Sequence, residues 1–151
     1  MVLNQTAEYS FRAMAALAGL APGESIAAPA LAERTGIPVH YLSKVMRKLV
    51  LGKLVRGQKG HGGGFQLARA PGSIRFAEIL AVTDQYPAPD RCGFGWGTCD
   101  PRNPCPLHPA WSRLNEAFQR WAESMTLADV TLPGAELLDR MRTPTRRKGP
   151  L

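Results

Sequence analysis

All three cysteines of the chain and one of its histidines lie in one short stretch. Cys92, Cys99 and Cys105 fall within fourteen residues, and His108 follows three positions after the last of them. The stretch reads RCGFGWGTCDPRNPCPLHPAW, which is rich in glycine and proline and has no hydrophobic periodicity. Thiolates and an imidazole on a flexible loop can close around a soft metal centre. The sequence therefore predicts a metal or iron–sulfur site on this loop.

Other uses of the cysteines stay open at this point. Zinc accepts the same ligand types, and clustered thiols can respond to oxidation. The amino terminus lacks a secretory pattern, because its first basic residue, Arg12, lies inside the apolar run. We therefore expect a cytoplasmic protein, in which thiols stay reduced. An enzyme with Cys105 as nucleophile and His108 as base is disfavoured, since no third orienting group is recognisable.

The composition favours a polyanionic partner over a membrane. The chain has 151 residues, a formal net charge of +7 and a pI near 9.8, which fits one domain with an appendage and a nucleic-acid partner. Seven basic residues lie between Arg34 and Lys59, and no acid follows Glu33 until Glu78. No apolar run approaches the roughly 18 residues that a membrane span needs.

Helical periodicity near the middle of this basic region predicts a helix-turn-helix. An amino-terminal helix is expected to end near Pro22-Gly23, a second to span 28–35, and a third to begin near Pro38 after a turn at Gly36. The third helix has an apolar stripe and an opposite polar, cationic face without acids. We expect its DNA contacts to be His40, Tyr41, Ser43, Lys44 and Arg47.

Two alternating segments follow this helix and predict a β-hairpin. They cover 53–56 and 64–67, and the glycine-rich sequence GQKGHGG joins them. A phosphate-binding Walker loop is excluded, since no GK[ST] pattern is present. A hairpin directly after a recognition helix is the wing of a winged helix. Its contacts with phosphates or the minor groove are expected from Arg56, Lys59 and His61.

Two further helices are expected around the cysteine loop. One covers Ser73 to about Thr83, with Ser73 as a possible N-cap. The other carries one apolar stripe, formed by Leu107, Trp111, Leu114, Phe118 and Trp121. This stripe could pack within the chain, but its position outside the winged-helix core favours dimerisation. A two-fold dimer presents two recognition helices to a palindromic operator.

These elements predict a mainly α fold with a small β-hairpin wing, a winged helix-turn-helix with a long dimerisation helix. The expected divisions are a DNA-binding domain at 1–84, a cysteine-rich cluster-binding loop at 85–106, a dimerisation helix at 107–131 and a basic, disordered tail at 132–151.

The chain resembles the bacterial Rrf2 family of winged-helix regulators, which includes iron–sulfur cluster regulators and nitric-oxide sensors. The resemblance covers about residues 1–130. It rests on the segments EYSFRA, LAERTGI, LVR with GGGF, the three cysteines, LHPAW and TLAD, in that order. Each is weak alone, but their order and spacing together are specific.

The resemblance implies a homodimeric transcription regulator whose three cysteines hold an iron–sulfur cluster, with [2Fe–2S] favoured over [4Fe–4S]. In relatives similar to the cluster-biogenesis regulator, a histidine at the position of His108 is the fourth ligand. In others an acidic side chain from the first helix of the second subunit completes the site, which here would be Glu8. One departure concerns the spacing: six residues separate Cys92 from Cys99, where five are usual.

Overall fold

The computed structural model describes residues 3–88 and 90–130, so the predicted tail at 132–151 lies outside the described part. The fold is mainly helical with one two-stranded antiparallel hairpin, which confirms the predicted fold class. In chain order the elements are α1 (Gln5–Ala18), α2 (Ala28–Thr35), α3 (Val39–Leu51), β1 (Val55–Gln58), β2 (Gly64–Leu67), the 3-10 turn η1 (Pro71–Ser73), α4 (Phe76–Val82), α5 (His108–Ser124) and the 3-10 turn η2 (Leu127–Val130).

The helices α1, α2 and α3 pack around one apolar core, as the periodicity predicts. Met14, Leu31 and Leu42 are completely buried there, one from each helix. Gly36 ends α2 with φ +67, a left-handed conformation that glycine adopts without steric cost. Pro38 then precedes α3, so the chain reverses within three residues. The helix-turn-helix therefore has the expected position.

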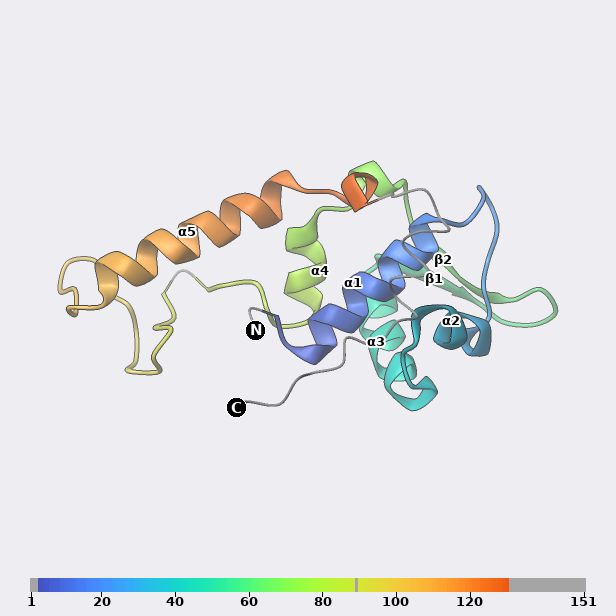
Figure 1. Ribbon diagram of the computed structural model, residues 1–151, viewed down its shortest axis with the longest axis horizontal. Helices are drawn as coiled ribbons and strands as arrows, with labels where there is room; N and C mark the ends of the chain where they lie inside the picture. The colour runs from blue at the N-terminus through green and yellow to red at the C-terminus, as the bar shows by residue number, and fades with distance from the viewer. Residues whose placement is uncertain (1–2, 89, 131–151) are drawn as a thin grey trace, which may run out of the picture.

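The hairpin β1–β2 extends from this core (Figure 1). Val55 pairs with Leu67 and Gln58 with Gly64. Strand β1 begins at Val55, two residues later than the predicted 53, because Lys53, with φ +59, forms the turn after α3. A third chain segment joins the hairpin, since Ile26 and Phe65 exchange backbone hydrogen bonds of 3.0 and 2.8 Å. The wing is thus anchored at its base.

The predicted N-cap of α4 is wrong. Ser73 belongs to η1, and its hydroxyl donates to the Ala70 carbonyl at 2.7 Å instead of capping a helix. Helix α4 begins at Phe76, after Ile74 and Arg75 in extended conformation. The Glu78 carboxylate accepts the Arg75 backbone N–H at 2.9 Å and so satisfies the amino-terminal end.

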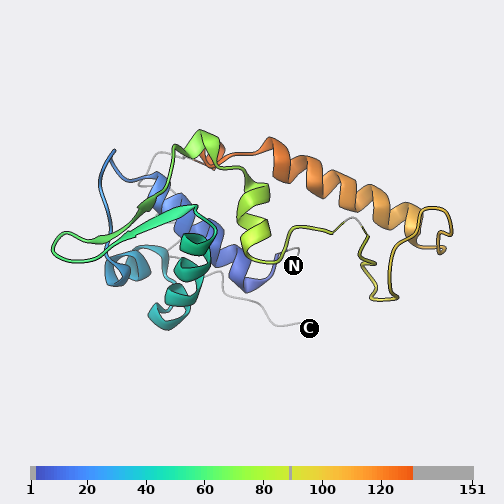
Figure 2. The same cartoon turned by 180° about the vertical axis from the view of Figure 1, so that it is seen from behind.

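The loop after α4 leads the chain away from the winged helix, and α5 runs back toward it (Figure 1). Figures 1 and 2 both show α5 extending away from the other helices, with the loop after α4 folded beside its distant half. The helix ends at Ser124, earlier than the 107–131 segment expected from sequence. The chain then pairs with the start of α4, through Phe76 N–H to Met125 O at 3.0 Å and Leu127 N–H to Ile74 O at 3.0 Å. Leu127 is completely buried in the winged-helix core.

Among the described residues, no helix combines the length and apolarity needed to cross a lipid bilayer.

Candidate functional site

The outer face of α3 carries the predicted DNA contacts. His40, Ser43, Lys44 and Arg47 are all exposed, while Leu42, Val45, Met46 and Leu49 on the opposite face are buried. The Ser43 hydroxyl donates to the Val39 carbonyl at 3.1 Å. Lys44 and Arg47 have no side-chain partner in the described part of the chain. Both cations are therefore available to phosphates or guanine edges.

Tyr41 differs from the other predicted contacts of α3. It is half-buried, its hydroxyl lies 3.1 Å from the Thr6 hydroxyl, and its ring meets that of Tyr9 edge to face at 5.0 Å. The structure thus gives Tyr41 a role in packing α3 on α1, where its hydroxyl is satisfied internally. Sequence periodicity alone does not reveal this, because Tyr41 lies at the border between the buried and polar faces.

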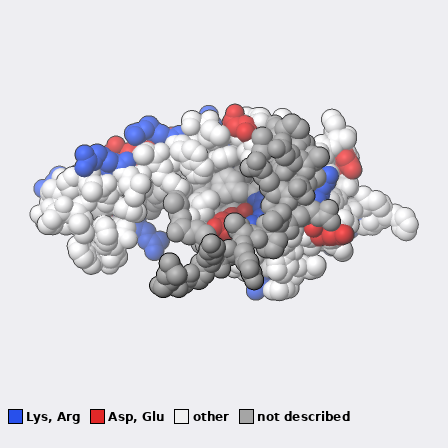
Figure 3. All heavy atoms as spheres, viewed as in Figure 1, with Lys and Arg blue, Asp and Glu red and all other residues white. Residues whose placement is uncertain are grey.

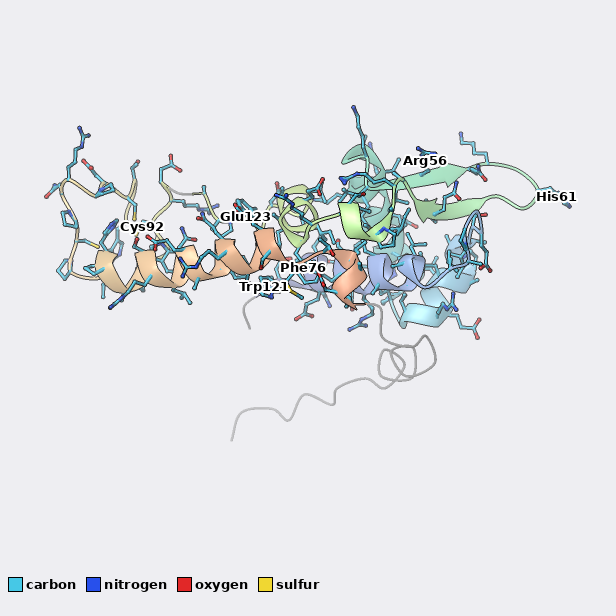
Figure 4. The ribbon with its side chains drawn as sticks, turned by 90° about the horizontal axis from the view of Figure 1, so that it is seen from above. Arg56, His61, Phe76, Cys92, Trp121 and Glu123 are labelled. Carbon is cyan, nitrogen blue, oxygen red and sulfur yellow. The ribbon has the colours of Figure 1, made fainter. Side chains whose placement is uncertain are left out.

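The wing presents its predicted DNA contacts to solvent. Arg56, Lys59 and His61 are exposed, and Figure 4 shows His61 at the tip of the hairpin and Arg56 at its base. Gly60 and Gly62 at the tip have φ of +99 and +72, so the turn needs glycine there. An extended basic surface can follow a phosphate backbone.

A hollow between the end of α3 and the wing adds residues that the sequence reading missed. It has a volume of about 570 Å³ and no acid lines it; its polar side chains are Lys53, Arg56, Gln58, Gln66 and Arg69. The antiparallel pairing places Arg56 opposite Gln66. Strand alternation could have identified Gln58, which shares a face with the predicted contact Arg56 because every second side chain of a strand points the same way; Lys53 and Arg69 lie outside the strands.

A second candidate site is the cysteine loop, where a small turn brings Cys92 and Cys99 together. The backbone of Arg91 bridges that of Thr98, with Cys92 N–H to Gly97 O at 3.3 Å and Cys99 N–H to Asp90 O at 2.8 Å. Gly95 and Gly97 have φ of +74 and +102, so glycine allows the reversal. Cys92 is buried and Cys99 partly buried.

The turn also polarises the sulfur of Cys92. The Phe94 backbone N–H donates to Cys92 Sγ at 3.4 Å. Hydrogen bonds from the backbone of Trp96 and Phe94 lower the pKa of the Cys92 thiol, and the neighbouring Cys99 thiol contributes in the same direction. Desolvation and the charge of Cys92 raise the pKa of Cys99. Cys92 is thus the cysteine whose thiolate the loop stabilises through backbone donors.

Cys105 and His108 lie at the start of α5. The His108 backbone N–H donates to the Cys105 carbonyl at 3.0 Å, and the charge of Cys105 contributes to the raised pKa of Cys99. Yet over residues 3–88 and 90–130 no three His, Cys, Asp or Glu side chains are arranged to hold one metal ion. Three free thiols on one loop, one of them with backbone N–H donors, do fit the ligand chemistry of an iron–sulfur cluster.

Glu8 is not part of this loop. It lies in the first turn of α1 and is partly exposed, whereas Cys92 lies beside the distant half of α5 (Figure 4). Of the five predicted metal ligands, the structure thus brings four onto one loop and its adjoining helix end, and it places Glu8 on another element.

The apolar stripe of α5 is only partly covered. Trp121 meets the ring of Phe76 at 5.3 Å, and Trp111 meets Phe94 at 6.2 Å, but Leu114 remains 63% exposed. Ala122 is the one fully buried residue of the helix. An open hollow of about 720 Å³ separates the stripe from the cysteine loop. Lys and Arg side chains follow the upper edge of the molecule over α5 in Figure 3.

Comparison with known proteins gives consistent matches. A family model for Rrf2, described as an iron-dependent transcriptional regulator, matches residues 3–132. An HTH-type transcriptional regulator of Azotobacter vinelandii is 30% identical over 149 residues, which cover 99% of this chain and 90% of that protein. The HTH-type transcriptional regulator IscR of Klebsiella pneumoniae is 31% identical over 109 residues, covering 72% and 66%.

The fold is also similar to a solved structure. CymR, the global cysteine regulator of B. subtilis, superposes with a TM-score of 0.71 at 21% identity, over 85% of this chain and 94% of that chain. This likeness shows the winged helix-turn-helix fold, and the family match supplies the activity class. The chain belongs to the Rrf2 family of DNA-binding transcription regulators and is not an enzyme.

Proposed function

We propose that this protein is a homodimeric transcription regulator whose affinity for a palindromic operator is controlled by an iron–sulfur cluster on Cys92, Cys99 and Cys105. The observation that carries the proposal is the turn at 91–99. It brings two thiols together and directs backbone N–H groups at the Cys92 sulfur. When bound, the cluster supplies a centre whose charge and ligation change on reaction with an oxidant or nitric oxide.

The residues of the chain hold and orient this centre. Hydrogen bonds to a thiolate stabilise its negative charge and adjust the reduction potential of the cluster it holds. Cys105 lies on the loop three residues before α5 begins at His108, so its ligation would join the turn to the segment that leads into the helix. The loop is thereby ordered against α5, on which the second subunit is proposed to dock.

Anaerobic purification tests the cluster. We expect a coloured protein with visible absorption, and stoichiometric iron and sulfide. Cys92→Ala should abolish the absorption while circular dichroism stays unchanged, because Cys92 lies outside the winged-helix core. Thr98→Ala, in the same turn but without a thiol, is the control and should keep the colour. A colourless protein that holds stoichiometric zinc would contradict the proposal of an iron–sulfur cluster.

The fourth ligand has two candidates. His108 lies next to Cys105 through a hydrogen-bonded turn, which supports ligation within one chain. The resemblance to relatives with a histidine at this position favours a [2Fe–2S] centre. Glu8 lies on α1 and would have to come from the second subunit. His108→Ala and Glu8→Ala should be compared by the visible spectrum. Whichever change leaves the spectrum untouched removes that candidate.

The DNA-binding part of the proposal rests on α3 and the wing. Lys44→Ala and Arg47→Ala should each weaken binding to a duplex selected from a random-sequence pool, since both cations are exposed and unpaired within the described residues. If Lys59 contacts phosphate, Lys59→Ala should weaken binding about equally across sequences and reduce the slope of affinity against salt by about one. Normal affinity in the Lys44 and Arg47 variants would contradict this docking.

A second candidate function keeps the DNA binding but replaces the cluster by zinc or a thiol switch. The turn at 91–99, which holds the backbones of Cys92 and Cys99 close together, favours it, because two neighbouring thiols can form a disulfide on oxidation. Metal analysis and mass spectrometry of the oxidised protein separate the two functions. A Cys92–Cys99 disulfide that changes DNA affinity in metal-free protein supports the switch.

A further inference from the structure

Four consecutive residues lead from α4 into the cysteine loop, and they contact three different helices. We propose that this connector, Asp84–Pro87, couples the cysteine loop to the DNA-reading helix α3 through the ion pair of Asp84 with Lys48. This inference rests on the proposed control of DNA affinity by the loop and names the residues that would carry it. Asp84 and Lys48 are positioning residues in this role.

The first half of the connector contacts the DNA-binding domain. Lys48 Nζ of α3 lies 2.9 Å from Asp84 Oδ2. The backbone N–H of Asn4, the residue that caps α1, donates to Gln85 Oε1 at 3.1 Å. Lys48 is on the same helix as Lys44 and Arg47, so a shift of Asp84 acts directly on the helix that presents the predicted DNA contacts.

The second half contacts α5. The Tyr86 hydroxyl donates to Glu123 Oε1 at 2.5 Å, and this bond raises the pKa of Tyr86. Gln119 Nε2 donates to the Pro87 carbonyl at 3.4 Å. The connector residues and Cys92 also line the same 720 Å³ hollow. A rearrangement of the loop around Cys92 therefore changes the surroundings of the connector, which ends only five residues before Cys92.

Close packing brings Asp84 within reach of Lys48. The carboxyl ends of α3 and α4 are in contact at Gly52, where a Cβ would lie 2.3 Å from Val82 Cγ1. Asp84 then turns the chain with φ +58, a left-handed conformation that Asp and Asn tolerate better than most residues. Gln85 and Tyr86 donate their backbone N–H groups to the Leu80 carbonyl at 2.8 and 3.2 Å. The carboxyl end of α4 is thus fixed in place, and the exposed side chain of Asp84 links it to Lys48 of α3.

The strength of this link suits a reversible coupling. The side chains of Lys48 and Asp84 are 43% and 85% exposed, and ion pairs this exposed contribute little to folding stability. Such a pair can be made in one state of the loop and broken in the other without unfolding either. A free-energy difference of that size corresponds to about a two- to fivefold change in DNA affinity.

Asp84→Asn is the primary test, because Asn keeps the left-handed turn and removes the charge. The quantity measured is the ratio of the DNA dissociation constants of cluster-loaded and cluster-free protein, on a duplex selected from a random-sequence pool. We expect the ratio to move about two- to fivefold toward one, with the visible spectrum unchanged. Glu33→Gln, which removes an exposed carboxylate of α2, is the control and should change both constants alike.

A double-mutant cycle separates the ion pair from unrelated effects. Lys48→Met should reduce the ratio as Asp84→Asn does, and the two changes together should reduce it no further. Independent, additive losses, or an unchanged ratio in Asp84→Asn, would overturn the coupling through this pair.

Hydrogen exchange of the α3 amides gives a readout that needs no DNA. Cluster loading should change the exchange rates at the carboxyl end of α3 in the wild-type protein and leave them unchanged in Asp84→Asn. If cluster loading changes the exchange of α3 but not the DNA affinity of the wild-type protein, the proposed function is wrong and the coupling through the connector is supported. If DNA affinity responds while exchange of α3 is the same with and without the cluster, the connector is wrong and the proposed function stands.

Discussion

Single side chains of α3 differ in what they already contact. Lys44 and Arg47 are exposed and have no partner in the described part of the protein, while Tyr41 is engaged with Thr6 and Tyr9. A residue with satisfied polar atoms contributes to stability, and a residue with free polar atoms is available to a ligand. The sequence pattern groups Tyr41 with Lys44 and Arg47 as DNA contacts. The structure separates them, because Tyr41 packs against α1 while the two cations are exposed.

Tyr41→Phe should reduce stability without weakening DNA binding. The change removes the hydroxyl that is bonded to Thr6 and keeps the ring, so the expected loss is about 0.5–1.5 kcal/mol of unfolding free energy. Urea unfolding followed by circular dichroism measures it. Lys44→Ala is the matched comparison, with stability within about 0.5 kcal/mol of wild type and reduced DNA affinity. A fall in DNA affinity for a fully folded Tyr41→Phe would show that the hydroxyl also reads DNA.

Asp129→Asn tests a capped turn at the end of the described chain. The Asp129 carboxylate accepts the Thr126 backbone N–H at 2.7 Å and the Thr126 hydroxyl at 2.9 Å, and these bonds lower its pKa. A lowered pKa means that the carboxylate stabilises the fold above its unfolded pKa of about 3.9, and that this stability is lost as pH falls through the folded pKa.

The unfolding free energies of wild type and Asp129→Asn should therefore differ at pH 7 and converge as the pH falls below about 4. Urea titrations at a series of pH values measure the gap. A gap that stays constant down to the acid limit would mean that the charge of Asp129 has no part in holding the turn.

At the scale of elements, periodic segments were predictable and contacts across the sequence were not. Helix α2 has the predicted bounds, because its apolar spacing and Gly36 are local signals. Ser73 misled the prediction of α4, because its hydroxyl donates to the Ala70 carbonyl within η1. The N-cap residue is Arg75, whose backbone N–H donates to the Glu78 carboxylate. The turn that joins Cys92 to Cys99 depends on backbone bonds in a segment without periodicity. Residue types therefore indicate candidate ligands there but not their arrangement.

Gly52→Ala tests the close approach of α3 and α4. Gly52 has φ −75, which alanine adopts easily, so any cost comes from the contact with Val82. Overpacking of this kind costs about 1–3 kcal/mol, measurable by thermal or urea unfolding. Gly19→Ala is the control, because its added Cβ would meet only ordinary contacts of 3.6 Å or more. If Val82→Ala in the Gly52→Ala background restores no stability, the clash is not the cause.

At the scale of the whole molecule, α5 is the element that the fold of one chain leaves incomplete. Its two ends contact different segments, at Phe94 and Phe76, while Leu114 between them is exposed. An amphipathic helix whose apolar side is only partly covered by the described residues indicates a partner surface. Glu116 on its polar side already has a partner within the helix, because it accepts the Ser112 hydroxyl at 3.1 Å.

Leu114→Arg should dissociate the proposed dimer. A cation without a partner is costly to bury at an interface, so the dimer dissociation constant should rise about tenfold or more. Analytical ultracentrifugation measures the constant, and circular dichroism should show an unchanged fold. Glu116→Arg, on the polar side of the same helix, should leave the dimer intact. A Leu114→Arg protein that remains dimeric at low concentration would exclude this face.

The backbone pairing of residues 74–76 with 125–127 ties together the two ends of a long excursion of the chain. The segment between them begins with α4, which packs on the winged-helix core, and continues with the cysteine loop and α5, which form an excursion from that core. The entropic cost of closing such a loop rises only logarithmically, by about 0.6 kcal/mol for each doubling of its length. The additional residue between Cys92 and Cys99 therefore costs the fold almost nothing. The cysteine loop can change its length and cysteine spacing while the winged helix keeps its stability.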